Sequence, residues 1–151
     1  MRNAIAIAVG WVCLVAGGCN QGITDKDIKM IGIDEVRRLT VDADKPSALL
    51  IDARPPRAYE RARIRGARSV QLTDIRADRT GANPDFGPYK TLVVYGEDPG
   101  SAPARALAKR LLTSGYDGVR MFSGGFAEWS GAGLPVEGSG DAKTPDSDTS
   151  R

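Results

Sequence analysis

The side chains that most often carry catalysis are scarce in this chain of 151 residues. It contains no histidine, and its two cysteines, Cys13 and Cys19, both lie in the first twenty residues. The chain therefore lacks the usual general base and the commonest ligand of transition metals. From residue 20 onward it also lacks any thiolate nucleophile, disulfide or cysteine metal site. We expect neither a bound metal nor a cofactor.

The stretch best suited to form a site covers residues 91–112. Its apolar, β-branched run at 92–95 predicts a strand buried on both faces. A helix is predicted to begin at Ser101 or Ala102, with Pro103 in its first turn. A strand, a tight loop and a helix N-terminus place backbone N–H groups at the carboxyl edge of a sheet, where open α/β folds bind ligands. The loop between them consists of Gly96, Glu97, Asp98, Pro99, Gly100 and Ser101.

Two kinds of chemistry could be assigned to this loop. Ser101 could act as a nucleophile, but no histidine can activate it, and a serine that caps the following helix explains it better. Glu97 and Asp98 could bind a hard cation, although two adjacent carboxylates are a weak signal. The loop therefore predicts where a site lies without assigning its chemistry.

The rest of the domain alternates predicted strands with predicted helices. Strands are expected at 28–33, at 48–52, after the turn at Gly66 and at 119–122, and short helices at 34–39, 57–61 and 126–130. The last helix is expected to bury Trp129. This alternation predicts an α/β fold with a parallel central sheet of about five strands and helices on both faces.

The first residues have the pattern of an export signal. Arg2 precedes an apolar run from 4 to 16, which is too short for a comfortable membrane span, and Gly17, Gly18 and Cys19 follow. The pattern resembles a bacterial lipoprotein signal, in which Cys19 becomes the lipidated first residue. An uncleaved N-terminal anchor is the alternative. The expected location is the cell envelope, as a membrane-anchored lipoprotein at the outer membrane or on the periplasmic side.

Composition sets the remaining boundaries. We assign 1–18 to the signal peptide, 19–27 to a tether, 28–137 to one folded domain and 138–151 to a Gly/Ser/Asp/Thr-rich tail predicted to be disordered. The net charge is +2, without a long block of like charge. We therefore expect no nucleic acid as a partner.

Several motifs occur in a telling order. The chain contains LLIDARPPRAYE, then RIRGA, TLVVYG, FSGGFAEW and LPVE. Together they resemble a rhodanese-like domain over about residues 30–137. Active members of that family carry a cysteine at the end of the central strand, which takes up sulfur as a persulfide. The resemblance places Gly96 at this nucleophile position, so no catalytic residue is assigned.

The resemblance implies further departures around the loop. The loop is about two residues longer than usual, and Arg63 stands where the family has histidine. Glu97 and Asp98 should repel anions such as thiosulfate. Asp52 and Arg54 match the family's Asp-x-Arg, which is either a wall of the site or a hydrogen-bonded structural corner. We favour the corner, because buried charges need partners.

Six arginines fall between residues 54 and 68. They are expected to form a solvated face paired with Glu60, Asp74 and Asp78. The alternative is a surface that binds an anion, a lipid headgroup or an acidic partner. These arginines are Arg54, Arg57, Arg61, Arg63, Arg65 and Arg68.

The sequence thus predicts a catalytically inactive rhodanese-like domain, exported and attached to a membrane through lipidated Cys19. Its expected role is that of a binding or regulatory module for an unidentified envelope protein or anionic ligand. The alternative is an enzyme of the family, with sulfurtransferase-related or metal-assisted chemistry in the loop from Gly96 to Ser101.

Overall fold

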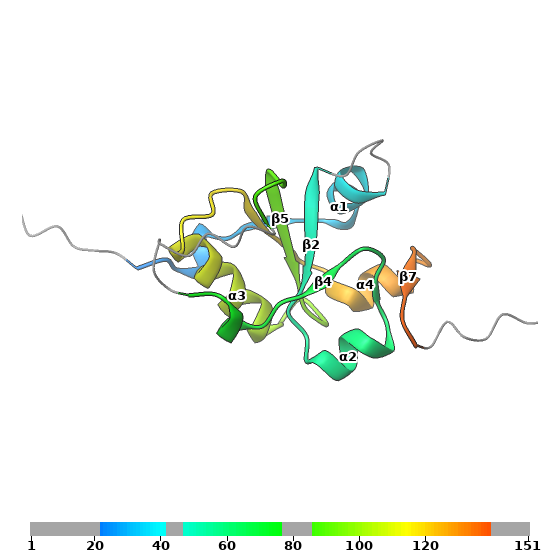
Figure 1. The fold of residues 1–151 in the computed structure, drawn as a ribbon. Helices are drawn as coiled ribbons and strands as arrows, with labels where there is room; N and C mark the ends of the chain where they lie inside the picture. The colour runs from blue at the N-terminus through cyan, green and yellow to red at the C-terminus, as the bar shows by residue number, and fades with distance from the viewer. Residues whose placement is uncertain (1–21, 42–46, 77–85, 140–151) are drawn as a thin grey trace, which may run out of the picture.

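The computed structural model describes residues 22–41, 47–76 and 86–139. Its centre is a five-stranded parallel sheet in the order β1-β6-β5-β2-β4, with helices on both faces (Figure 1). The predicted fold class is confirmed. The non-sequential strand order places the carboxyl ends of β2 and β5 side by side in the middle of the sheet, where a site is expected.

The two central strands are completely buried. They are β2 (Ala48–Asp52) and β5 (Thr91–Tyr95), which pair in register so that Asp52 lies beside Tyr95. Strands of this kind read as continuous apolar runs because helices cover both of their faces. The outer strands are β6 (Val119–Phe122), β1 (Lys29–Ile31) and β4 (Arg68–Ser69).

Each face of the sheet has its own core. On one face, α3 (Ala102–Thr113) packs Leu107 and Leu111 against the sheet, beside the 3-10 helix η2 (Leu72–Asp74). The other face is covered by α1 (Ile33–Thr40) and α4 (Gly125–Gly131), which bury Val36 and Trp129. The burial of Trp129 confirms its predicted place in the core. The short helix α2 (Pro56–Arg61) follows β2.

A second, two-stranded sheet was not predicted. It pairs β3 (Arg63–Ile64) antiparallel with β7 (Val136–Glu137). Strands of two residues leave no alternation of polar and apolar residues to read. The indole N–H of Trp129 donates to the carbonyl of Pro135 at 3.0 Å, which holds the segment before β7 against α4.

Ordered contacts extend beyond the predicted domain boundaries at both ends. Residues 25–27 of the predicted tether form the 3-10 helix η1 (Asp25–Asp27), and Asp25 pairs with Lys109 of α3 at 2.7 Å. At the other end, the hydroxyl of Ser139 donates to the carbonyl of Glu60 at 3.1 Å. The predicted signal peptide and most of the predicted tail lie outside the described residues. Within those described, no helix is long and apolar enough to cross a bilayer.

The start of α4 packs directly on the segment that follows β5. The amides of Phe126 and Ala127 donate to the carbonyls of Gly96 and Glu97, at 2.8 and 2.9 Å. The helix can approach this closely because Gly125 has a φ of +64° and no Cβ; a Cβ there would lie 2.8 Å from the carbonyl oxygens of both residues. The helix thereby satisfies two of its free N–H groups and fixes the loop.

Replacing Gly125 with alanine should therefore lower the free energy of unfolding by about 2–4 kcal/mol, since it adds a left-handed backbone penalty to a backbone collision. Gly131→Ala, at the other end of α4, is the matched control because its Cβ would meet nothing within 4 Å. That variant should be neutral or slightly stabilising. Urea unfolding measures both, and equal stabilities would contradict the role given to Gly125.

Candidate functional site

The predicted loop begins at the carboxyl end of β5, in the centre of the sheet. Gly96 is buried, whereas the next four residues are exposed. The carboxylate of Asp98 accepts a hydrogen bond from the amide of Gly100 at 2.9 Å, and its carbonyl accepts from the amide of Ser101 at 3.2 Å. The loop is thus a compact turn clamped between α3 and α4.

The side chain of Ser101 fills the space in front of Gly96. A Cβ on residue 96 would lie 1.9 Å from the Ser101 hydroxyl oxygen and 2.2 Å from its Cβ, with the Ala104 Cβ at 3.2 Å. Ser101 stands at the N-cap of α3 but makes no capping hydrogen bond through its side chain. The prediction that it caps the helix in this way is therefore wrong. Its side chain instead occupies the space that a side chain on residue 96 would need.

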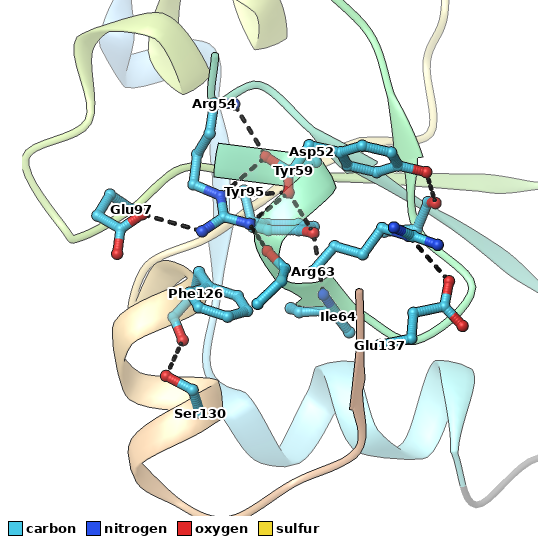
Figure 2. Close-up of polar contacts among 12 residues, drawn as sticks. Asp52, Arg54, Tyr59, Arg63, Ile64, Tyr95, Glu97, Phe126, Ser130 and Glu137 are labelled. Carbon is cyan, nitrogen blue, oxygen red and sulfur yellow. Dashed lines mark hydrogen bonds and ion pairs between the residues drawn. The ribbon is translucent and has the colours of Figure 1, made fainter. Parts of the chain in front are cut away.

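A buried charged corner lies beside the loop. Asp52 is fully buried and Arg54 is 4% exposed. The Nε and Nη2 atoms of Arg54 donate to both carboxylate oxygens of Asp52, at 2.8–3.2 Å, and Nη2 also donates to the carbonyl of Ala62 at 2.6 Å. The Tyr95 hydroxyl donates to Asp52 at 2.7 Å and accepts from the amide of Ile64 at 3.2 Å (Figure 2). These contacts are those of a hydrogen-bonded corner.

The electrostatics of this corner favour a charged Arg54 and a neutral Tyr95. Burial disfavours the charged guanidinium, but the hydrogen bonds to Asp52 and Glu97, together with the attraction of the Asp52 charge, outweigh burial and raise the pKa of Arg54. Burial also raises the pKa of Tyr95 strongly, and the Asp52 carboxylate raises it further. Tyr95 therefore stays a neutral donor to Asp52, and Arg54 stays charged.

The remaining edge of Arg54 points toward the loop. Its Nη1 donates to the Glu97 carboxylate at 3.0 Å, and the guanidinium carbon lies 3.9 Å from the centre of the Phe126 ring. Arg54, Glu97 and Phe126 line a hollow of about 280 Å³ together with Ala58, Arg61 and Ala62 of the α2 region. Glu97 is therefore paired with a cation, whereas Asp98 only closes its own turn.

Arg63, the third predicted wall residue, has contacts outside the loop. Its Nε donates to Glu137 at 2.9 Å, and its guanidinium stacks over the Tyr59 ring at 4.6 Å. It thus ties β3 to β7. The expected pairing of the arginines with Glu60 and Asp74 is wrong for Arg54 and Arg63, which pair with other acids. Asp78 lies outside the described residues.

The two adjacent carboxylates of the loop, Glu97 and Asp98, face different partners. Within residues 22–41, 47–76 and 86–139, no three His, Cys, Asp or Glu side chains gather in a way that could hold a metal ion. Glu97 turns to Arg54 and Asp98 to Gly100, so the two adjacent carboxylates do not share one ligand position.

Several residues at the site were not predicted to belong there. Tyr95 was predicted only as part of a buried strand and Phe126 only as part of a short helix, and Ala62 contributes only its carbonyl. The register of β2 and β5 offers a signal for Tyr95, because a tyrosine at the end of a buried strand lies next to Asp52 and needs a partner for its hydroxyl. Backbone carbonyls such as that of Ala62 leave no trace in the sequence.

Comparison with known proteins identifies the fold around this site. Residues 34–132 match the family described as the rhodanese-like domain. The chain belongs to this family. No curated protein matches it.

Solved structures of rhodanese-like architecture resemble the chain at low identity. A protein from Bacillus halodurans is 22% identical with a TM-score of 0.63, covering 79% of this chain and 83% of that one. A protein of unknown function from Rhodopseudomonas palustris, described as a possible tyrosine phosphatase, is 25% identical with a TM-score of 0.62 and coverages of 75% and 87%. A thiosulfate sulfurtransferase from Pseudomonas aeruginosa is 23% identical with a TM-score of 0.55, covering 76% of this chain but only 21% of that one.

The raised pKa of Tyr95 predicts a loss of stability at alkaline pH. The unfolded chain releases the tyrosine proton near pH 10 and the folded chain does not. The contribution of Tyr95 to the free energy of unfolding is thus complete below about pH 10. Above this pH it falls by about 1.4 kcal/mol per pH unit. Urea unfolding at pH 8–11 should show a steeper decline for the wild type than for Tyr95→Phe. Parallel declines would contradict the coupling.

Proposed function

We propose that this protein is a rhodanese-like domain without sulfurtransferase activity, which acts as a binding or regulatory module at the cell envelope. The observation that carries the proposal is the packing of Ser101 against Gly96 at the start of the loop. Gly96 begins the loop, and the Ser101 side chain occupies the space in which a residue 96 side chain would lie. A persulfide needs a thiolate, and residues 20–151 contain no cysteine.

The charges around Gly96 support the same conclusion. Glu97 lies at the rim and shares the hollow with Arg54, so that the nearest buried cation already has two carboxylate partners. An incoming thiosulfate dianion would meet a site whose positive charge is largely neutralised. The site is therefore unfavourable for the family's donor even before the missing nucleophile is considered.

Attachment to a membrane is the second part of the proposal. It rests on the sequence of the first nineteen residues, with a positive start, a short apolar run and two glycines before Cys19. The partner would be an envelope protein or an anionic ligand, presented to the domain at the membrane surface. A diacyl anchor at Cys19 would retain the protein there, because two acyl chains hold a protein stably in a bilayer.

The alternative function is that of a family enzyme. Its motivation is the likeness to the thiosulfate sulfurtransferase from Pseudomonas aeruginosa, of which this chain covers only a fifth. Such an enzyme would have to use Cys13 or Cys19, or chemistry without a thiol in the loop from Gly96 to Ser101.

An activity assay separates these two functions. We expect the purified chain to form no more thiocyanate from thiosulfate and cyanide than a heat-inactivated sample. Cys13→Ser/Cys19→Ser is the matched control, since it removes every thiol of the chain. Turnover by the wild type would overturn the proposal. Turnover that persists in the control would assign it to chemistry without a thiol, and turnover lost in the control would assign it to one of the two cysteines.

Lipidation gives an independent test of location. When the full chain is expressed in a bacterium with a radiolabelled fatty acid, the label should appear on the protein and the protein should sediment with membranes. Cys19→Ser should lose the label and leave the membrane fraction, whereas Cys13→Ser should keep both. Equal labelling of the two variants would contradict Cys19 as the lipidated residue.

A further inference from the structure

The guanidinium of Arg54 has one nitrogen, Nη1, that the buried corner does not use. Its Nε and Nη2 groups are taken up by Asp52 and the carbonyl of Ala62, at 2.6–3.2 Å. Only Nη1 reaches beyond the corner, to Glu97 at 3.0 Å. A buried guanidinium N–H group of fixed orientation is well suited to donate to a carboxylate oxygen, because a hydrogen bond between two charged groups is strong.

The carboxylate of Glu97, which accepts from Nη1, is loosely held. Glu97 is 58% exposed, and its contact with Arg54 is the one ion pair it forms with the described residues. Ion pairs with one exposed partner contribute little, because solvent competes for the charge and the side chain loses freedom on pairing. Glu97 can therefore leave Arg54 at low cost, while Arg54 itself stays fixed by Asp52, Ala62 and the ring of Phe126.

The hollow beside Arg54 combines charge with apolar walls. Arg61 supplies a second, exposed guanidinium, which has no hydrogen bond or ion pair with the described part of the chain, and Ala58, Ala62 and Phe126 supply carbon surfaces. In Figure 2, Phe126 lies beneath the guanidinium of Arg54 and Glu97 reaches it from the side. The volume of about 280 Å³ is sufficient for a molecule the size of a small organic acid.

We propose that this hollow is a binding site for small organic carboxylates, in which Glu97 is a built-in competitor that must swing out before the ligand binds. The carboxylate class follows from the occupant that the site already accepts at Nη1. The apolar walls favour an acid with a carbon skeleton over an inorganic oxyanion. This inference rests on the proposed function, because it gives the non-catalytic module its ligand.

The charges on the hollow explain why Glu97 controls access. Asp52 and Glu97 balance Arg54 and Arg61 in the wild type, so an external anion gains little from the local field. Removing the Glu97 carboxylate leaves one net positive charge and an Nη1 atom of Arg54 without its acceptor. The loss of the competing carboxylate and the gain in positive charge should both tighten the binding of an external carboxylate.

The test measures benzoate affinity of the full chain by calorimetry, for the wild type and for Glu97→Ala. We expect Glu97→Ala to bind benzoate about fivefold more tightly, which corresponds to about 1 kcal/mol. Glu60→Ala is the matched control, because it removes the same charge from exposed α2 without altering the hollow; it should bind like the wild type. Adding Arg61→Ala to Glu97→Ala should weaken binding again.

Equal benzoate affinities of the wild type, Glu97→Ala and Glu60→Ala would overturn the proposal. A preference of Glu97→Ala for sulfate or thiosulfate over benzoate would also overturn it. A direct readout guards against indirect effects of substitution. In NMR titrations of the wild type, benzoate should shift the Arg54 Nε–H and Phe126 ring signals, and shifts confined to other residues would also overturn it.

The thiocyanate assay is run on the same preparations. Absence of benzoate binding together with absence of turnover would refute the carboxylate site and leave the non-catalytic function standing. Turnover would refute the non-catalytic function whatever benzoate does.

Discussion

The buried contact between Asp52 and Arg54 is the constraint on which the site depends. Through these two side chains and the Tyr95 hydroxyl, the end of β2 is joined to the end of β5, to β3 at Ile64 and to the residue after α2 at Ala62. A buried ion pair of this kind need not add net stability, because desolvation of two charges offsets their attraction. Its effect is to fix how these segments meet, since leaving any of these groups without its partner would be costly.

The contacts that hold the loop in place come from its backbone and from the neighbouring corner. The loop carbonyls of Gly96 and Glu97 are held by the first amides of α4, and the corner holds Arg54 on the other side. None of these contacts involves a side chain at position 96. The scaffold around the loop therefore does not depend on a side chain at this position. Membership of the fold family alone says little about the chemistry of the loop.

The sequence predicted the elements well where local chemistry determines them. The apolar runs of β2 and β6 predicted strands with the observed bounds, and the turn predicted at Gly66 lies between β3 and β4. The two-residue strands β3 and β7 were missed because their pairing is set by tertiary contacts. At the site, Asp52, Arg54 and Glu97 could be named, but not that Glu97 faces Arg54: a contact between residues 43 positions apart has no local signature.

Ser101 shows why position and role must be separated when such a loop is read. Its place before α3 and its hydroxyl both suggested a cap, and the helix does begin after it, yet its side chain turns to the space over Gly96 instead. The two residues are complementary in volume, because a side chain on one excludes the observed place of the other. A cysteine introduced at position 96 alone would thus collide with Ser101, so such a substitution needs a compensating change at Ser101. Glu97 acts on the other side of the loop, since it places a carboxylate on Nη1 of Arg54 at the border of the hollow. Steric exclusion at Gly96 and charge pairing at Glu97 are thus separate effects, and a substitution at one of these positions need not change the other.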